Sequence, residues 1–172
     1  PAWPAAKPVR VVVAFTAGGT TDILARQVAQ QLTERLKQQF VIDNKPGAGG
    51  NLGTGEVVRA APDGYTLIVN SVGPIAVNPT LYRALPYNPL TDLVPIVQIA
   101  EVPNVLVVHP SVPARTVEEL ITYAKANPGV LNYGSTGIGT SSHLSSYMLA
   151  KRGGFEATHI AYKGADALRD LL

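Results

Sequence analysis

The chain has 172 residues, 46% hydrophobic and 15% charged, which is enough for one sizeable domain or for one lobe and part of another. Its 14 Lys and Arg residues against 12 Asp and Glu residues give a formal net charge of +2, and the basic residues are scattered, which argues against nucleic acid as a partner. The absence of cysteine excludes disulfides, thiolate metal sites and cysteine nucleophiles. No apolar stretch approaches the roughly 18 residues of a membrane span.

The first predicted unit is a strand followed by a helix. Val9 to Phe15 is an apolar, mostly β-branched run, which is typical of a strand buried on both faces. Apolar residues then recur every four positions from Leu24 to Leu36, which predicts an amphipathic helix. We expect Thr20 or Thr21 to cap this helix, with Asp22 capping its first turn or tethering the preceding loop.

The same pattern then repeats. A second strand is predicted from Phe40, a Gly-rich loop over residues 46–50, a helix over residues 52–61 with Asn51 as its cap, and a third strand over residues 65–70. Strand, helix, strand, helix, strand at this spacing predicts a doubly wound parallel sheet.

The middle of the chain is less regular. Residues 74–92 are rich in proline, and we expect only a short turn near residues 79–84. Apolar runs predict strands at residues 94–100 and 105–109. We place a lobe boundary near residues 100–104, which gives an N-terminal part of lobe 1 and an incomplete lobe 2, residues 1–102 and 103–172.

The last third alternates strands and helices again. Thr116 to Glu119 matches a capping box at the start of a helix. The elements predicted after it are a strand over 130–135, a Gly/Ser/Thr loop over 134–142, a helix over 144–151, a strand over 159–162 and a helix from Ala165 that stops without a cap, which suggests a chain cut short.

Three loops share one chemistry. Residues 16–22, 46–51 and 134–142 are small, Gly-rich and hydroxyl-bearing, and each precedes a helix. Such loops expose backbone N–H groups beside the positive end of a helix, so their natural target is an anion. The structural alternative is that such turns only allow close packing in a doubly wound fold. The spacing does not match a dinucleotide fingerprint, a P-loop or a hydrolase nucleophile elbow.

The titratable residues give little support to catalysis. We interpret His109 as structural, His143 as structural or as a support of the binding loop, and His159 as a packing residue. No carboxylate pair or nucleophile–base pair stands out, and no histidines cluster with carboxylates. We therefore expect no catalytic residue, no metal and no cofactor.

Several motifs, taken in order, resemble one family. They are Val11-Val12-Val13-Ala14-Phe15-Thr16-Ala17-Gly18-Gly19-Thr20-Thr21-Asp22, Asp43-Asn44-Lys45-Pro46-Gly47-Ala48-Gly49-Gly50, Pro62-Asp63-Gly64-Tyr65-Thr66-Leu67, Asn132-Tyr133-Gly134-Ser135-Thr136-Gly137-Ile138-Gly139-Thr140-Ser141-Ser142-His143-Leu144 and Ala161-Tyr162-Lys163-Gly164. Together they are similar to the Bug-type receptors of tripartite tricarboxylate transporters.

The resemblance implies an α/β, two-lobed periplasmic binding protein-like fold (type II-like) that closes around its ligand. It implies a non-enzymatic, periplasmic receptor, with its signal peptide removed, that delivers a small carboxylate-type ligand to membrane permease subunits and is a monomer at full length. The ligand-binding residues that it implies are Ala17, Gly18, Gly19, Thr20, Asp22, Ser71, Ser135, Thr136, Gly137, Gly139, Thr140, Ser141 and His143. A nucleotide- or phosphate-binding α/β enzyme, or a receptor-fold sensor without a transport role, remains as an alternative.

Overall fold

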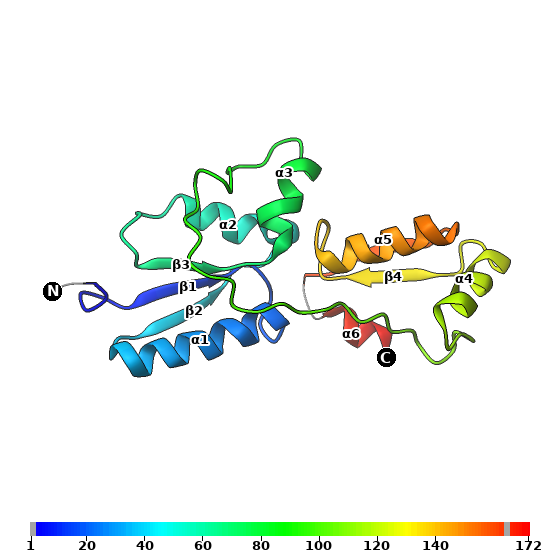
Figure 1. The fold of residues 1–172 in the computed structure, drawn as a ribbon, viewed down its shortest axis with the longest axis horizontal. Coiled ribbons are helices and arrows are strands. Elements are labelled where there is room, and N and C mark those ends of the chain that lie inside the picture. Colours follow the sequence, from blue (N-terminus) through cyan, green and yellow to red (C-terminus); the bar gives the residue numbers. More distant parts are fainter. Residues whose placement is uncertain (1–2, 164–165) are drawn as a thin grey trace.

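A computed structural model describes residues 3–163 and 166–172. Two small parallel sheets, joined by a long segment without regular structure, organise this part of the chain (Figure 1). Gly164, in the last motif, and Ala165, at the predicted start of the last helix, lie outside the described residues. In the described ranges, no helix combines the length and the apolar content that crossing a bilayer requires.

The first sheet is parallel and has the order β2-β1-β3, so the predicted doubly wound unit is confirmed. Its strands are β1 (Val9–Val13), β2 (Phe40–Asn44) and β3 (Thr66–Val69). The central strand β1 is almost entirely buried, because it has a neighbour on each side and a helix over each face. This is the environment that a continuous β-branched run predicts.

Two helices make the crossovers of this sheet. The helix α1 (Thr20–Leu36) leads from β1 to β2, and α2 (Asn51–Val58) leads from β2 to β3. Since β2 and β3 flank β1 on opposite sides, right-handed crossovers place the two helices on opposite faces. Figure 1 draws them on opposite sides of the strands, with α1 burying Ala25 and Ala29.

The starts of both helices differ from the prediction. The N-cap of α1 is Gly19, with an extended backbone and no capping side chain, so the expectation of a cap at Thr20 or Thr21 is wrong. The N-cap of α2 is Gly50, at a φ of 96°, and the expected cap Asn51 is the first residue of the helix. In both cases a glycine adopts the turn from loop to helix, which leaves the amides of the first turn without a side-chain acceptor.

The proline-rich stretch after β3 is more helical than expected. A π-helical turn, Gly73–Val77, leads into α3 (Asn78–Leu81), where the sequence predicts only a short turn. The side-chain oxygen of Asn51 accepts hydrogen bonds from the Asn78 amide at 2.6 Å and from the Tyr87 hydroxyl at 2.9 Å. These buried contacts between distant residues hold the stretch against α2.

The two strands predicted at residues 94–100 and 105–109 are absent. The structure assigns no regular element there, and Val94 and Val105 are 89% and 78% exposed. A strand exists only when a neighbouring strand pairs with it, and within the described residues no strand lies alongside this segment. Figure 1 shows it as the extended connection between the two sheets.

The second sheet is a parallel pair, β4 (Asn132–Ser135) and β5 (Thr158–Ala161). The helices of this part are α4 (Val117–Ala126), α5 (Ser141–Gly153) and α6 (Asp166–Leu171). The side chain of Thr116 caps α4, as predicted, by accepting from the Glu119 amide. In a complete capping box the Glu119 carboxylate would accept from the Thr116 amide. Here it accepts from the amide of the preceding residue, Arg115, at 2.6 Å.

Candidate functional site

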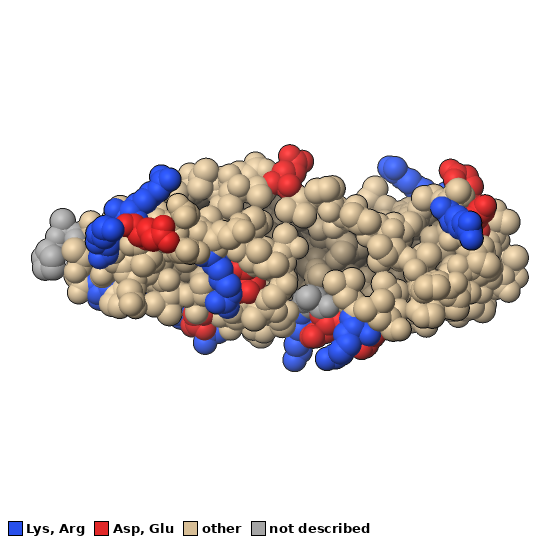
Figure 2. All heavy atoms as spheres, turned by 90° about the horizontal axis from the view of Figure 1, so that it is seen from below, with Lys and Arg blue, Asp and Glu red and all other residues tan. Residues whose placement is uncertain are grey.

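The candidate site lies where the parallel strands of the first sheet end. Because β1, β2 and β3 run in the same direction, the loops that follow them meet at one edge of the sheet, as does Ser71, which comes two residues after β3. Ligands of open α/β sheets bind at this edge. Figure 2 shows the surface hollowed between the two parts of the chain, and the atoms that line the hollow have the colour of uncharged residues.

The loop between β1 and α1 presents backbone groups at this edge. Ala17, Gly18 and Thr20 are exposed, and Gly19 is half-buried. Gly18 adopts a φ of 83°, which favours glycine, and its N–H donates to the Asp22 carboxylate at 2.9 Å. No side chain caps α1, so the amides of its first turn face the edge together with the positive end of a long helix.

Asp22 ties this loop to the sheet. It is 2% exposed, and its carboxylate accepts from the Arg26 guanidinium and from the Asn44 side-chain amide, each at 2.9 Å. The Asn44 amide also donates to the carbonyl of Phe15 at 3.0 Å. Asp22 therefore tethers the loop, which is one of the two roles predicted for it, and it does not act as the helix cap.

The charge of Asp22 is compensated within the network. Burial raises the pKa of this carboxyl, but hydrogen bonds from Arg26, the Gly18 amide and Asn44 outweigh burial and lower the pKa to about 2. The group is thus ionised at neutral pH, and the adjacent Arg26 offsets the repulsion that it exerts on an anion at the loop. The sequence gives only a weak sign of these partners, namely the i,i+4 spacing of Arg26.

The loop after β4 is held by its own hydroxyl groups. Ser135 and Thr140 are 2% and 3% exposed. The Thr140 hydroxyl donates to the Gly137 carbonyl at 2.6 Å, and the Ser135 oxygen accepts from the Gly137 amide at 3.1 Å. Among the residues predicted to bind a ligand from this loop, Thr136 and Ser141 are the exposed ones. The buried pair shapes the loop and leaves these two facing solvent.

Two histidines lie behind this loop. The Gly139 amide donates to Nδ1 of His143 at 3.3 Å, and the ring of His143 is 4.2 Å from that of His159. Nε2 of His159 lies 2.7 Å from the Ser135 hydroxyl. The contact has the distance of a nucleophile–base pair, but Ser135 is buried and inaccessible to a substrate. His159 was predicted only to pack, and its contact with Ser135 could not be predicted because the two residues come from separate elements.

The two parts of the chain meet through glycines. Gly139, at a φ of 84°, lies so close to Asn78 that a Cβ there would clash with the Asn78 side-chain oxygen, and a Cβ on Gly49 would clash with the Ile138 carbonyl. Asn78 is fully buried, and its side-chain oxygen has no partner among the described residues. The predicted loops 46–51 and 134–142 are therefore brought together.

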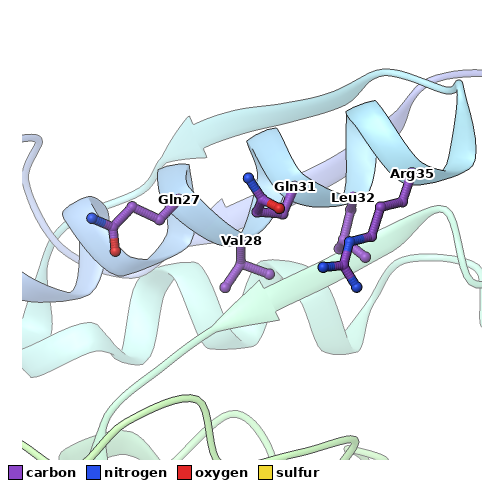
Figure 3. A pocket seen from close by; sticks show the side chains of 5 residues that line it. All are labelled: Gln27, Val28, Gln31, Leu32 and Arg35. Carbon is purple, nitrogen blue, oxygen red and sulfur yellow. The ribbon is translucent and has the colours of Figure 1, made fainter.

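A hollow of about 340 Å³ lies elsewhere, on the surface of α1 (Figure 3). Its lining comes from one helix: Gln27, Val28, Gln31, Leu32 and Arg35. Because α1 runs away from the carboxyl edge of the strands, this hollow does not belong to the candidate site. Across residues 3–163 and 166–172, no three His, Cys, Asp or Glu side chains are grouped so as to hold a metal ion.

Comparison with known proteins gives consistent matches. A family model described as "Tripartite tricarboxylate transporter family receptor" matches residues 24–172. A UPF0065 protein from Bordetella pertussis is 44% identical over 158 residues, which are 92% of this chain and 49% of that protein. The chain therefore spans about half the length of this curated relative.

Two solved structures from Rhodopseudomonas palustris match nearly the whole chain. One, solved with adipate, has a TM-score of 0.95 and 44% identity, covering 99% of this chain and 57% of its own. The other, MatC with bound malate, has a TM-score of 0.90 and 33% identity, covering 97% of this chain and 57% of its own. These matches confirm the predicted α/β, periplasmic binding protein-like fold.

Proposed function

The chain belongs to the tripartite tricarboxylate transporter receptor family, and on that premise we propose that it forms part of a receptor that captures a small carboxylate without chemical change. The site would use the loop of residues 17–20 and the start of α1 from one side, with Ser71 nearby. From the other side it would use the exposed residues of the loop 135–142. We also propose that residues 1–102 belong to the first lobe of the receptor and residues 103–172 to the second.

The observation that carries the proposal is an uncapped helix start tied down by a buried carboxylate. The first-turn amides of α1 have no side-chain acceptor, and the bond from Gly18 to Asp22 fixes the loop before them. A helix end adds about 0.3–1 kcal/mol for an exposed anion, and up to about 2 kcal/mol for a sheltered one. Hydrogen bonds to a charged group contribute about 1.5–3 kcal/mol each. A few such bonds suffice for reversible capture.

The ligand class, partners and location are proposed with it. The two R. palustris structures were solved with adipate and with malate, and both ligands are small dicarboxylates. We propose the same class for this chain. The receptor would act as a monomer in the periplasm and deliver its ligand to the permease subunits of a tripartite transporter. The family description supports the delivery to such a transporter.

The experiment replaces single donors of the loop. Thr20 is the first residue of α1, where proline is tolerated in a helix, and Gly19 before it is already extended. Thr20→Pro removes one amide donor, whereas the matched variant Thr20→Ala keeps that amide and removes the hydroxyl. Calorimetric titration with adipate and malate should show about tenfold weaker binding for Thr20→Pro, and a smaller change for Thr20→Ala.

The same titration covers ATP and inorganic phosphate. Binding of these anions without binding of either dicarboxylate would overturn the receptor proposal and favour a nucleotide- or phosphate-binding enzyme. Equal dicarboxylate affinity in the wild type and in Thr20→Pro would mean that the first amide of α1 does not bind the ligand.

A further inference from the structure

The histidine pair, His143 and His159, holds the loop 135–142 at two points. At the beginning of the loop, the Ser135 hydroxyl lies 2.7 Å from Nε2 of His159. In its middle, the buried Gly139 donates its amide to Nδ1 of His143 at 3.3 Å. The two rings are in contact, with centroids 4.2 Å apart, so the two attachment points are mechanically linked.

Each end of the pair matters for the loop's shape. Ser135 also accepts from the Gly137 amide, so the hydroxyl connects His159 to the turn of the loop. Gly139 packs against the buried Asn78 of the first part of the chain. A change at the pair therefore reaches both the presented residues and the contact between the two parts.

The bond from Gly139 requires a neutral His143. Nδ1 can accept a hydrogen bond only when it carries no proton, so the neutral ring has its proton on Nε2. An imidazolium donates from both nitrogens, and its Nδ1–H would oppose the Gly139 N–H. The amide of Gly139, a buried residue, would then lose its acceptor, and an unsatisfied donor in a buried position costs free energy.

The surroundings of the pair favour the neutral form. Burial lowers the pKa of His143, and burial together with the charge of His143 lowers the pKa of His159. The facing titratable group on β4 is Tyr133, which stacks on His159 and whose own pKa is raised by burial and by Tyr147 of α5. Among the described residues, no carboxylate, lysine or arginine contributes to either imidazole pKa.

We propose that the histidine pair positions the loop 135–142 for ligand capture, that it does so only while His143 is neutral, and that affinity therefore falls as the pair takes up protons. This inference rests on the proposed function, because it assumes that the loop contacts the ligand. An imidazolium would also attract an anion, but that attraction is screened by water and salt across an open hollow. The loss of the Gly139 acceptor acts directly on the loop, so we expect it to dominate.

The first test needs no ligand. The Gly139 amide signal in ¹H–¹⁵N spectra of the wild-type chain is followed as the pH falls from about 8 to about 5, alongside the imidazole signals, since histidine ordinarily titrates near 6.5. The Gly139 signal should titrate together with His143. A Gly139 signal that stays constant while His143 titrates would overturn the positioning role, whatever the chain binds.

The second test uses adipate and three variants. His143→Asn keeps a neutral acceptor near the position of Nδ1, His143→Leu removes it, and His109→Leu is the control at an exposed histidine outside the loop. At about pH 8, His143→Leu should bind about tenfold more weakly than the wild type, while His143→Asn and His109→Leu stay within about threefold. At about pH 5.5, the wild type should lose about fivefold more affinity than His143→Asn. Because adipate is protonated to the same extent in both titrations, this difference reports the protonation of the protein.

The outcomes separate the two proposals. A wild-type affinity that rises at low pH relative to His143→Asn would mean that the imidazolium attracts the ligand directly, and would overturn the positioning role. If neither the wild type nor any variant binds adipate or malate at either pH, the dicarboxylate proposal fails, and the Gly139 titration alone decides the role of the pair.

Discussion

Asp22 shows how a single buried carboxylate can organise the loop that precedes a helix. Its two oxygens join the Gly18 amide, the Arg26 side chain and the Asn44 side chain, which belong to a loop, a helix and the end of a neighbouring strand. An isolated buried charge is costly, but one that is fully hydrogen-bonded and paired is held in place by its own partners. Asp22 can therefore fix the backbone amides at the candidate site.

Replacing Asp22 by asparagine should lower the free energy of unfolding by about 1–3 kcal/mol at neutral pH, because the charge-assisted bonds are lost. The pKa of Asp22 is lowered from 3.8 to about 2, so its stabilisation is present above the unfolded value and lost as the pH falls through about 2. Urea denaturation from about pH 7 down to about pH 2 should show the difference between Asp22→Asn and the wild type shrinking below about pH 4.

The control for this series is Glu34→Gln, which changes an exposed carboxylate on the same helix. Its stability should stay within about 0.5 kcal/mol of the wild type. A difference between Asp22→Asn and the wild type that does not change with pH would mean that the carboxylate charge is not what holds the loop.

The helices α4 and α1 begin in two chemically different ways. The helix α4 has a threonine cap, in which Thr116 accepts from the Glu119 amide at 3.1 Å. The helix α1 starts after Gly19 and has no side-chain cap. The cap completes the hydrogen bonds of a structural helix, whereas its absence leaves donors at the helix that faces the candidate site.

This contrast predicts different costs for the same substitution. Thr116→Ala should lower the free energy of unfolding by about 1 kcal/mol, because the amide of α4 loses its acceptor. Thr20→Ala should stay within about 0.5 kcal/mol of the wild type, because Thr20 caps nothing. Urea denaturation of the two variants compares them directly, and an equal loss in both would mean that Thr20 does act as a cap.

The two parts of the chain touch at glycines. Gly139 lies against Asn78, and Gly73 lies near the carbonyl of Gly139, where an added Cβ would be 3.2 Å from that oxygen. Glycine at these positions leaves room for the Asn78 side chain against Gly139 and for the Gly139 carbonyl against Gly73. The contact therefore depends on residue size on both sides of the junction.

Gly139→Ala tests this contact, and Gly18→Ala is its matched control. Both glycines have a φ near the left-handed region, 84° and 83°, so alanine strains the backbone equally, by about 1–2 kcal/mol. An added Cβ meets nothing within 4 Å at Gly18 but clashes with Asn78 at Gly139. Gly139→Ala should therefore cost about 1–3 kcal/mol more than Gly18→Ala in urea denaturation. Equal costs would mean that the contact between the two parts adds no stability.

Much of the first sheet could be predicted from local pattern alone. The β-branched run of β1 and the four-residue apolar repeat of α1 predict a strand and a helix, because each has the period of its element. The residues that α1 buries fully include Ala25 and Ala29, which lie beside that repeat. The segment 94–108 shows the limit of this reasoning. Its apolar pattern is that of strands, but pairing depends on a partner that the pattern does not specify.

The features of the candidate site also differ in whether local pattern could predict them. Residue type and spacing are enough to predict which loops are Gly-rich, which helices follow them and that the parallel strands end at one edge. The contacts of Asp22 with Asn44, of His159 with Ser135 and of Gly139 with Asn78 became visible only in the folded chain. Those contacts join residues far apart in the chain, and no local propensity encodes a contact whose partner arrives only when the chain has folded.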